Sequence, residues 1–456
     1  MKNVFSGWRY LWTSQDIRHK LTITLIVLII YRLAANIPAP GINGAALKSL
    51  LQSTSGSGTF FAFLDLLSGG TISRFSLLAM GVYPYITAQI ILQLLVPIFP
   101  ALQRKMEEDP REGRKWQEKW TYYLSVPMAA LSALGQINLF NSYSVQGGNA
   151  QIVAFGFTSS LWLSSTALLM TMIGGTMFAI WLGELISEYG IRGQGLSLII
   201  FAGIVSRIPA NFGTLLADKQ HGWILVISMA VVMVAVIYAI VFVQQGRRNV
   251  PVMYPGRRVG NRMSMPVKGT LPLMVNLAGM IPLIFASAIL QFPEIIASYF
   301  INSSNATVAK LATSAQTTFN GGNWVYWLLY FLMVVSFTFF YTDVLFTQQN
   351  YGENLKKVGA QIPGVNRGAP TQKYLTKVQR RVTLPGALFL GIVAVLPFLI
   401  NSILKSVGVS AASSSSTLFL VSSAGLLIVV GVVRDVFLNI DAELKLHGYE
   451  DARLVR

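Results

Sequence analysis

Cysteine is absent from this sequence of 456 residues, and histidine occurs only three times, as His19, His221 and His447. Disulfides, thiol catalysis and cysteine-based metal sites are therefore excluded, and we expect no metal or haem in the interior. Charged residues make up only 12% of the chain, against roughly 25% in an ordinary soluble domain. With 53% hydrophobic residues and a mean hydropathy of +0.55, the composition excludes a disordered, fibrous or plain soluble protein. No P-loop pattern occurs, so we predict no ATPase activity, no cofactor and no enzyme.

Long apolar stretches predict membrane-spanning helices, because a bilayer core requires about 20 mostly apolar residues per helix. Ten stretches qualify: Leu21–Ile37, Ser73–Val96, Trp120–Phe140, Leu161–Leu185, Leu196–Pro209, Trp223–Val243, Leu271–Phe300, Trp324–Tyr341, Leu384–Ile403 and Leu418–Asn439. The segment before the first stretch lacks the cleavage site of a signal peptide, so we interpret this stretch as a true span. The predicted fold is an all-α polytopic membrane protein.

The charges are unevenly distributed among the segments between the stretches. The chain has 35 Lys and Arg against 18 Asp and Glu, a net charge of +17. Alternate segments, beginning with the N-terminus, hold 28 of the 35 cations, and the segments between them hold 5. Cytoplasmic loops are enriched in Lys and Arg, so this alternation predicts ten spans with both termini cytoplasmic. A missed or spurious helix would break the alternation.

Two of the cytoplasmic loops, residues 244–270 and 343–383, are long and strongly basic. They hold 13 of the 28 inside cations and contain Pro/Gly turns such as Tyr254-Pro255-Gly256 and Ile362-Pro363-Gly364. One interpretation is a topology signal with contacts to lipid head groups. We favour a docking face for a large anionic partner, such as ribosomal RNA or an acidic motor surface. The candidate docking residues are Arg247, Arg248, Arg257, Arg258, Lys356, Lys357 and Arg367.

The segment 58–70 is apolar but too short to span a membrane. Its apolar part, Phe60 to Leu67, has eight residues and is flanked by Gly and Ser. Glycine and serine permit hinge motion, so the segment could fold back into the bundle and close a cavity. A surface helix lying in the membrane interface is an equal alternative.

Ionisable residues are few within the predicted spans, and those present lie near span ends: Arg32, Glu184, Glu188 and Glu294. This pattern weakens the interpretation as a proton-coupled transporter or a cation channel. The second and seventh spans instead contain uncharged polar residues and helix breakers, including Pro84 and Pro282, and we interpret them as a separable seam. They are second in two five-span halves of opposite orientation, residues 1–210 and 211–456, which predicts an inverted repeat around a central pathway.

Five strings resemble, in order and over nearly the whole chain, the SecY family of central subunits of the bacterial Sec protein translocase. They are Tyr31–Gly41, Ser68–Leu95, Glu188–Val205, Leu271–Leu290 and Leu426–Val433. The resemblance implies an hourglass channel that passes unfolded polypeptides across the cytoplasmic membrane or sideways into lipid. It also implies that segment 58–70 is a plug, with Phe60, Phe61, Phe63, Leu64 and Leu67 as its apolar residues.

The resemblance also assigns roles within the spans. It implies an apolar constriction, the pore ring, formed by Val82, Ile86, Leu196, Ile200, Ile284 and Ile428. Branched aliphatic side chains exclude water and so resist ions, although the same six residues read alone are typical of an ordinary bundle core. The second and seventh spans would form a lateral gate that includes Thr87, Gln93, Asn276 and Phe292.

The partners that the resemblance implies are SecE- and SecG-like small membrane subunits, the SecA ATPase or the ribosome at the basic loops, signal-bearing preproteins and membrane lipids. The second basic loop departs from the family pattern, because Asn366 stands where most members have Arg and Arg367 follows it. An accessory translocon for few substrates therefore stays open as an alternative. A second alternative, from another class, is a secondary transporter of a small solute built on an inverted repeat.

Overall fold

The computed structural model describes residues 15–44, 47, 71, 75–99, 102, 109–146, 152–153, 155–156, 161–206, 209, 222–255, 258–259, 262–263, 267–301, 305–319, 323–406 and 422–446. By packing, the chain divides into two compact units. The first comprises Met1–Met233, Ile289–Tyr326 and Pro397–Arg456, and the second comprises Val234–Ala288 and Trp327–Leu396. The predicted halves, residues 1–210 and 211–456, concern internal symmetry, which packing does not measure, and they stay a prediction.

The described part of the first unit is helical. It contains α2 (Gln15–Ala34), α5 (Tyr83–Ile98), α7 (Pro110–Gln146), α8 (Trp162–Tyr189), α9 (Gly195–Val205), α13 (Ala306–Phe319) and α18 (Ser422–Leu446), with the first part of α11 (Gly222–Gln245) and the ends of α12 (Ile281–Phe300) and α16 (Ala369–Ser406). Helix α8 packs against α2, α7 and α9. Helix α9 also packs against α2 and α18, and α5 packs against α7.

Glycines let the helices of the first unit approach closely. A Cβ atom on Gly175 of α8 would overlap the carbonyl oxygen of Leu77, and one on Gly195 of α9 would overlap the carbonyl oxygen of Gly183. Small residues at such crossings are typical of membrane helices, where van der Waals packing holds helices together. Helix α8 is therefore the element against which the turn before α5 and the start of α9 are positioned.

An ion pair joins the N-terminal and C-terminal helices of the first unit. Lys20 Nζ lies 2.8 Å from Glu443 Oε1 on α18 and 3.1 Å from Asp16 Oδ2, one turn earlier on α2. The hydrogen bond to Glu443 is the largest cause that raises the pKa of Lys20, which precedes the first predicted span. Nearby, Asn439 of α18 donates a hydrogen bond to the carbonyl oxygen of Arg192.

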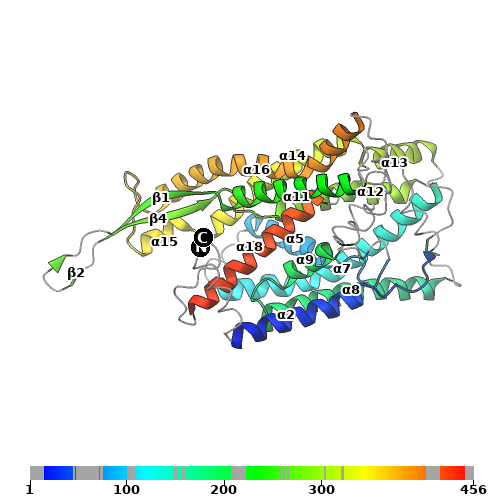
Figure 1. Cartoon of the computed structure of the whole chain (residues 1–456), viewed down its shortest axis with the longest axis horizontal. Helices are drawn as coiled ribbons and strands as arrows, with labels where there is room; N and C mark the ends of the chain where they lie inside the picture. The colour runs from blue at the N-terminus through cyan, green and yellow to red at the C-terminus, as the bar shows by residue number, and fades with distance from the viewer. Residues whose placement is uncertain are drawn as a thin grey trace. The chain divides into compact units, whose positions relative to one another are not determined.

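The second unit combines helices with an antiparallel ribbon. Its elements are β1 (Arg247–Tyr254), β2 (Arg258–Val259), β3 (Arg262–Met263), β4 (Val267–Met274), α14 (Trp324–Gln348) from Trp327 onwards, α15 (Tyr351–Lys357), and the remaining parts of α11, α12 and α16. Strands β1 and β4 pair over eight residues, from Arg247 opposite Met274 to Tyr254 opposite Val267. Strand β2 pairs with β3 and lies beyond the ends of β1 and β4 (Figure 1).

The ribbon corrects the all-α prediction, although the described chain is mostly helical as expected. In β1, Val250 and Val252 are buried while their neighbours are exposed, which is the period of two that a half-buried strand requires. The two valines pack with Leu273, Phe346, Ala360, Ile362 and Leu375 in one hydrophobic cluster. Charge and Pro/Gly turns dominate the sequence of this loop, and the alternation of Val250 and Val252 is the signal for a strand within it.

Each of the ten predicted spans overlaps a helix. Among the described residues, four helical segments are long and apolar enough to cross a membrane, and they lie in α7, in α8, in α14 together with α15, and in α16. The count of ten spans stays a prediction. The predicted start of the seventh span was wrong, because Leu271 to Met274 belong to β4 and α12 begins only at Ile281. Helix α13, in contrast, was not predicted.

Candidate functional site

The pore-ring candidates of α5 lie at its N-terminal end. Val82 is the N-cap residue and Pro84 follows in the first turn, where the fixed φ of proline favours helix initiation. The amide of Ile86 donates to the carbonyl oxygen of Val82 at 3.2 Å, so the two side chains lie one turn apart on one face. Val82 is buried and Ile86 is half-buried. This end of α5 therefore presents two branched aliphatic side chains on the same face.

The candidates of α9 and α18 lie on helices that pack together. Leu196 and Ile200 are one turn apart on α9, and both are half-buried. Leu196 also reaches α8, because its Cδ2 atom would lie 2.7 Å from a Cβ on Gly183. Ile428 of α18 is only 2% exposed. The first unit thus holds five of the six ring candidates, and the packing of α9 on α18 brings the helices of three of them together.

Ile284, the sixth ring candidate, lies in the second unit on α12 and is 7% exposed. The helix is held against α14 by aromatic contacts. Phe285 stacks on Phe337 with ring centroids 5.1 Å apart, and the hydroxyl of Tyr330 donates to the carbonyl oxygen of Leu283 at 3.4 Å. Because Ile284 belongs to a different unit from the other five, the ring as a whole stays a prediction.

The gate candidates differ in their surroundings. Thr87 is buried, and its hydroxyl donates to the carbonyl oxygen of Tyr83 at 3.0 Å within α5, while Gln93 is half-buried. Asn276 lies in the turn between β4 and α12, not within a helix as predicted. Its Nδ2 donates to the carbonyl oxygen of Gly279 at 3.2 Å, and its Oδ1 has no hydrogen-bond partner among the described residues. Phe292 lies on α12, but its side chain lies outside the described part.

The plug candidates lie outside the described residues. This holds for the whole segment 58–70 and therefore for Phe60, Phe61, Phe63, Leu64 and Leu67. Thr71 is the first described residue after this segment. It is buried, and its hydroxyl donates a hydrogen bond to the carbonyl oxygen of Ala79 at 3.4 Å. The role of the segment as a plug stays a prediction.

The docking candidates come together on one body of the second unit. The ribbon contacts the second basic loop through Met253 and Gln361, whose amides each donate to the other residue's carbonyl oxygen at 2.8 Å. Arg247 and Arg248 on β1, Lys356 and Lys357 on α15, and Arg367 are all exposed. Arg257 lies outside the described residues, as does the side chain of Arg258 on β2. The ribbon, α15 and the loop that leads into α16 thus form one packed surface, the docking platform. Five of the seven predicted cations project from this platform rather than from separate loops.

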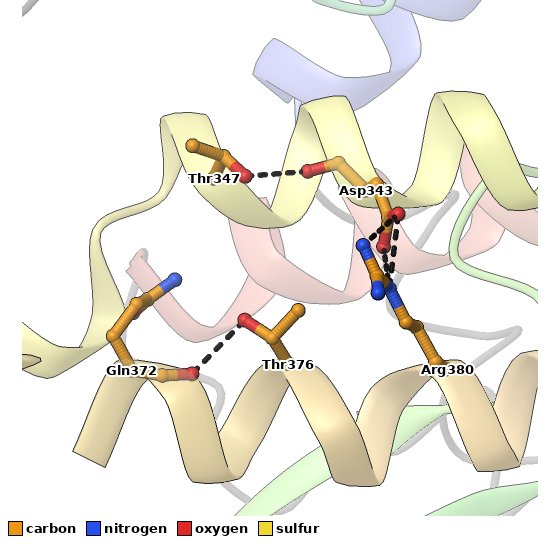
Figure 2. Close-up of polar contacts among 5 residues, drawn as sticks. All are labelled: Asp343, Thr347, Gln372, Thr376 and Arg380. Carbon is orange, nitrogen blue, oxygen red and sulfur yellow. Dashed lines mark hydrogen bonds and ion pairs between the residues drawn. The ribbon is translucent and has the colours of Figure 1, made fainter. Parts of the chain in front are cut away.

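An ion pair that sequence reasoning missed joins the helices on either side of the second loop. Figure 2 shows Asp343 of α14 and Arg380 of α16 pointing toward each other. Arg380 Nε donates to both carboxylate oxygens at 3.0 Å, and its Nη2 donates to Oδ2 at 2.7 Å. The sequence gives a weak signal for this ion pair, because the loop holds seven cations and only two acids, Asp343 and Glu353.

The SecY family model matches residues 76–437, which include every described ring and gate candidate. The chain belongs to the SecY family. The SecY protein translocase subunit of Corynebacterium glutamicum is 35% identical over 445 residues, covering 95% of this chain and 97% of that protein. The corresponding subunit of Thermotoga maritima is 37% identical over 441 residues, covering 95% and 94%. The SecY family comprises protein translocation channels and not classical enzymes, and its members are multi-pass membrane proteins.

Solved structures agree in fold. A SecY channel, studied for the plug domain that stabilises its closed state and maintains a membrane seal, gives a TM-score of 0.61 at 18% identity, covering 96% of this chain and 95% of that one. Sec61 in the canine ribosome–channel complex from the endoplasmic reticulum gives a TM-score of 0.57 at 18% identity, with the same coverage. At this identity the likeness shows the SecY fold alone.

Proposed function

We propose that this chain is the pore-forming subunit of a protein translocase, which passes unfolded polypeptides across a membrane and releases hydrophobic segments sideways into lipid. The observation that carries the proposal is membership of the SecY family along residues 76–437, supported by a channel fold over 96% of the chain. A small-solute transporter has no comparable support.

The pore ring of this channel comprises Val82, Ile86, Leu196, Ile200, Ile284 and Ile428. Val82 and Ile86 lie one turn apart at the start of α5, and Leu196 and Ile200 lie one turn apart on α9, which packs on α18. This arrangement supports the assignment. Branched aliphatic side chains suit the task, because a narrow apolar ring excludes ions by dewetting. They also offer no specific hydrogen bond to the chain that passes through.

The lateral gate contains Thr87, Gln93, Asn276 and Phe292. The buried Oδ1 of Asn276, without a partner in the described part of the chain, supports a role at a surface that rearranges. A buried acceptor that lacks a partner costs roughly 1–3 kcal/mol, which a gate state that supplied a donor would regain. Signal sequences would leave through this gate because Leu, Ile, Phe and Val each favour the bilayer by about 0.3–0.6 kcal/mol.

The plug is segment 58–70. Its apolar part is too short to span a membrane, and its flanks are rich in Gly and Ser. The structure with TM-score 0.61 is of a channel with a plug domain, which supports a plug in this chain. In the closed state Phe60 to Leu67 would lie against the pore ring.

The chain lies in the bacterial cytoplasmic membrane with ten spans and both termini cytoplasmic. The uneven distribution of Lys and Arg supports this orientation. The platform of ribbon, α15 and the start of α16 then faces the cytoplasm and docks SecA or the ribosome, and SecE- and SecG-like subunits bind the bundle. The presence of Sec61 in a ribosome–channel complex supports ribosome docking for this fold.

Arg367, which follows the position where most family members have Arg, contacts the cytoplasmic partner in place of Asn366. Asn366 and Arg367 are both exposed, and the backbone carbonyl oxygen of Asn366 accepts a hydrogen bond from the Thr371 hydroxyl at 2.7 Å. The turn is thereby anchored to α16, and the exposed guanidinium can reach a partner.

Import into proteoliposomes tests the function. Full-length protein, reconstituted with a SecE-like helix, should import a signal-bearing preprotein when SecA and ATP are supplied, and protease should then spare the imported chain. Uptake of a small solute without preprotein import would overturn the proposal.

An Arg367→Gln variant tests the contact of Arg367 with the cytoplasmic partner. The variant should lower the import rate while leaving the thermal midpoint unchanged.

A further inference from the structure

The chain between β4 and α12, residues 275–280, links the ribbon to a helix of the proposed lateral gate, and we call it the joint. It runs as an irregular turn, in which Gly279 has a φ of +64° that favours glycine. Asn276 closes this turn, because its Nδ2 donates to the carbonyl oxygen of Gly279 at 3.2 Å. Any change in the position of α12 relative to the ribbon must be absorbed by the backbone of the joint.

Helix α16 holds the ribbon side of the joint through one buried side chain. Gln379 Nε2 donates to the carbonyl oxygen of Met274, the last residue of β4, at 3.0 Å and to Thr383 Oγ1 at 3.2 Å. Gln379 is 1% exposed and Thr383 is fully buried, so neither side chain can take part in docking a partner. A hydrogen bond that is shielded from water is strengthened by its surroundings, and the end of β4 is therefore fixed to α16.

Backbone packing holds Val275, the first residue of the joint. A Cβ atom on Gly386 of α16 would lie 2.6 Å from the carbonyl oxygen of Val275, so the helix approaches the joint more closely than a larger residue would permit. The amide of Val275 also donates to the carbonyl oxygen of Gly246, which precedes β1, at 2.9 Å. Because Val275 is held by both elements, movement of α12 is left to the residues from Asn276 to Gly279.

Two buried oxygens at the joint lack hydrogen-bond partners in the described part of the chain. They are Oδ1 of Asn276 and Oε1 of Gln379. A buried acceptor without a partner disfavours the conformation that contains it. A rearranged joint that supplied donors would therefore compete with the present one, and the bond from Gln379 to Met274 opposes that rearrangement.

We propose that Gln379 is a positioning residue for the lateral gate, since its bond to Met274 fixes the joint and thereby holds α12 in place until a signal sequence engages. The inference rests on the proposed function for the gate role of α12. Part of the free energy that a hydrophobic signal supplies is then used to displace α12. Without the bond, a less hydrophobic signal opens the gate. Gln379 thus sets how hydrophobic a signal must be for import.

Import of two preproteins into proteoliposomes, with SecA and ATP supplied, tests this role. One preprotein has an intact signal, and the other has an apolar core shortened by roughly four residues, which lowers its preference for lipid. The measurement is the import rate of the second divided by that of the first. Gln379→Met keeps the length of the side chain but removes the donor, and it should raise this ratio about two- to tenfold, as one ordinary hydrogen bond shifts an equilibrium.

A second buried glutamine provides the matched control. Gln316 on α13 is 2% exposed and belongs to the other unit. Gln316→Met should leave the import ratio within twofold of wild type. An unchanged ratio in Gln379→Met would overturn the proposal, as would an equal rise in Gln316→Met.

Two glycines of α16 separate positioning from general loss of stability. Gly386→Ala would press on the backbone of Val275, whereas Gly391→Ala would press on side chains of α14, chiefly the ring of Phe331 at 2.7 Å. Both substitutions add a methyl group at a crowded position of the same helix, so both should lower the thermal midpoint. Only Gly386→Ala should raise the import ratio. An equal rise in both variants would overturn the proposal, because the ratio would then report destabilisation alone.

Hydrogen exchange of the detergent-purified protein tests the joint without import. The amide of Leu283 donates to the carbonyl oxygen of Met280 at 3.2 Å at the start of α12. Gln379→Met should speed its exchange on the order of two- to tenfold and leave α8 unchanged. Unchanged exchange at Leu283 would reject the positioning role even in a channel that imports preprotein. Faster exchange in a protein that imports nothing would support the hold of Gln379 on α12 and reject only the translocase function.

Discussion

Two adjacent glycines of α8, Gly174 and Gly175, have opposite surroundings. A Cβ on Gly175 would overlap the carbonyl oxygen of Leu77, in the turn that leads to Val82 and α5, whereas a Cβ on Gly174 would meet nothing within 4 Å. We predict that Gly175→Ala destabilises the protein by about 1–3 kcal/mol, because backbone must move to make room. The thermal midpoint of detergent-purified protein is the measurement.

Gly174→Ala is the matched control for this substitution. It adds the same methyl group to the next residue of the same helix, and we expect it to be neutral or stabilising by roughly 0.5–1 kcal/mol, since alanine favours a helix over glycine. Similar midpoints for the two variants would show that α8 does not position the turn before α5 through Gly175.

The pair of Asp343 and Arg380 offers a second prediction at a single contact. Its side chains are 34% and 61% exposed, so the contribution is limited by solvent. We expect Asp343→Asn to lower stability by about 0.5–1 kcal/mol, near the upper end for exposed pairs because the contact is bidentate. A double-mutant cycle with Arg380→Gln measures the coupling, which should shrink in 1 M salt as screening increases. Strictly additive effects would mean that the pair contributes nothing.

Among the elements, the helices could be predicted from apolar runs in the sequence, whereas the ribbon could not be predicted from apolar runs or charge. Apolar runs near 20 residues require burial or lipid wherever they occur, so a helix appears in each predicted span. The ribbon depends instead on Val250 and Val252 packing against Phe346 and Leu375, which are about 95 to 125 residues further along the chain. Such a long-range contact leaves only a short alternation in the sequence, and the charges around it concealed that signal.

The ribbon should therefore depend on its distant support. Leu375 is fully buried beneath it, and Leu375→Ala should cost about 2–5 kcal/mol of local stability, because it opens a cavity in a small cluster. Hydrogen exchange at Val250 and Val252 is the measurement, with faster exchange expected there and unchanged exchange in α8. Tyr374→Ala, at a neighbouring exposed position, is the control, and equal protection loss in both variants would contradict the packing role of Leu375.

At the scale of the whole molecule, the channel assignment could be made from the sequence only through the family resemblance. Val82, Ile284 and Ile428 are buried like the residues of the core, and nothing in their local pattern separates a pore ring from bundle packing. The docking platform shows the complementary case, since its cations were visible as charge but not as one surface. Chemistry that depends on helices from distant parts of the chain is beyond what periodicity or spacing can reveal.

The ring makes one prediction that belongs to the molecule as a whole. A closed channel resists ions because apolar side chains leave its narrowest part dry, so Ile86→Asn should admit water and raise ion conductance at least tenfold in planar bilayers. Ile29→Asn is the matched control, since Ile29 lies on α2 with 51% of its surface exposed. If Ile86→Asn conducts no more than wild type or the control, then Ile86 is ordinary bundle core. A leak in both variants would instead indicate general damage to the bundle by a polar substitution.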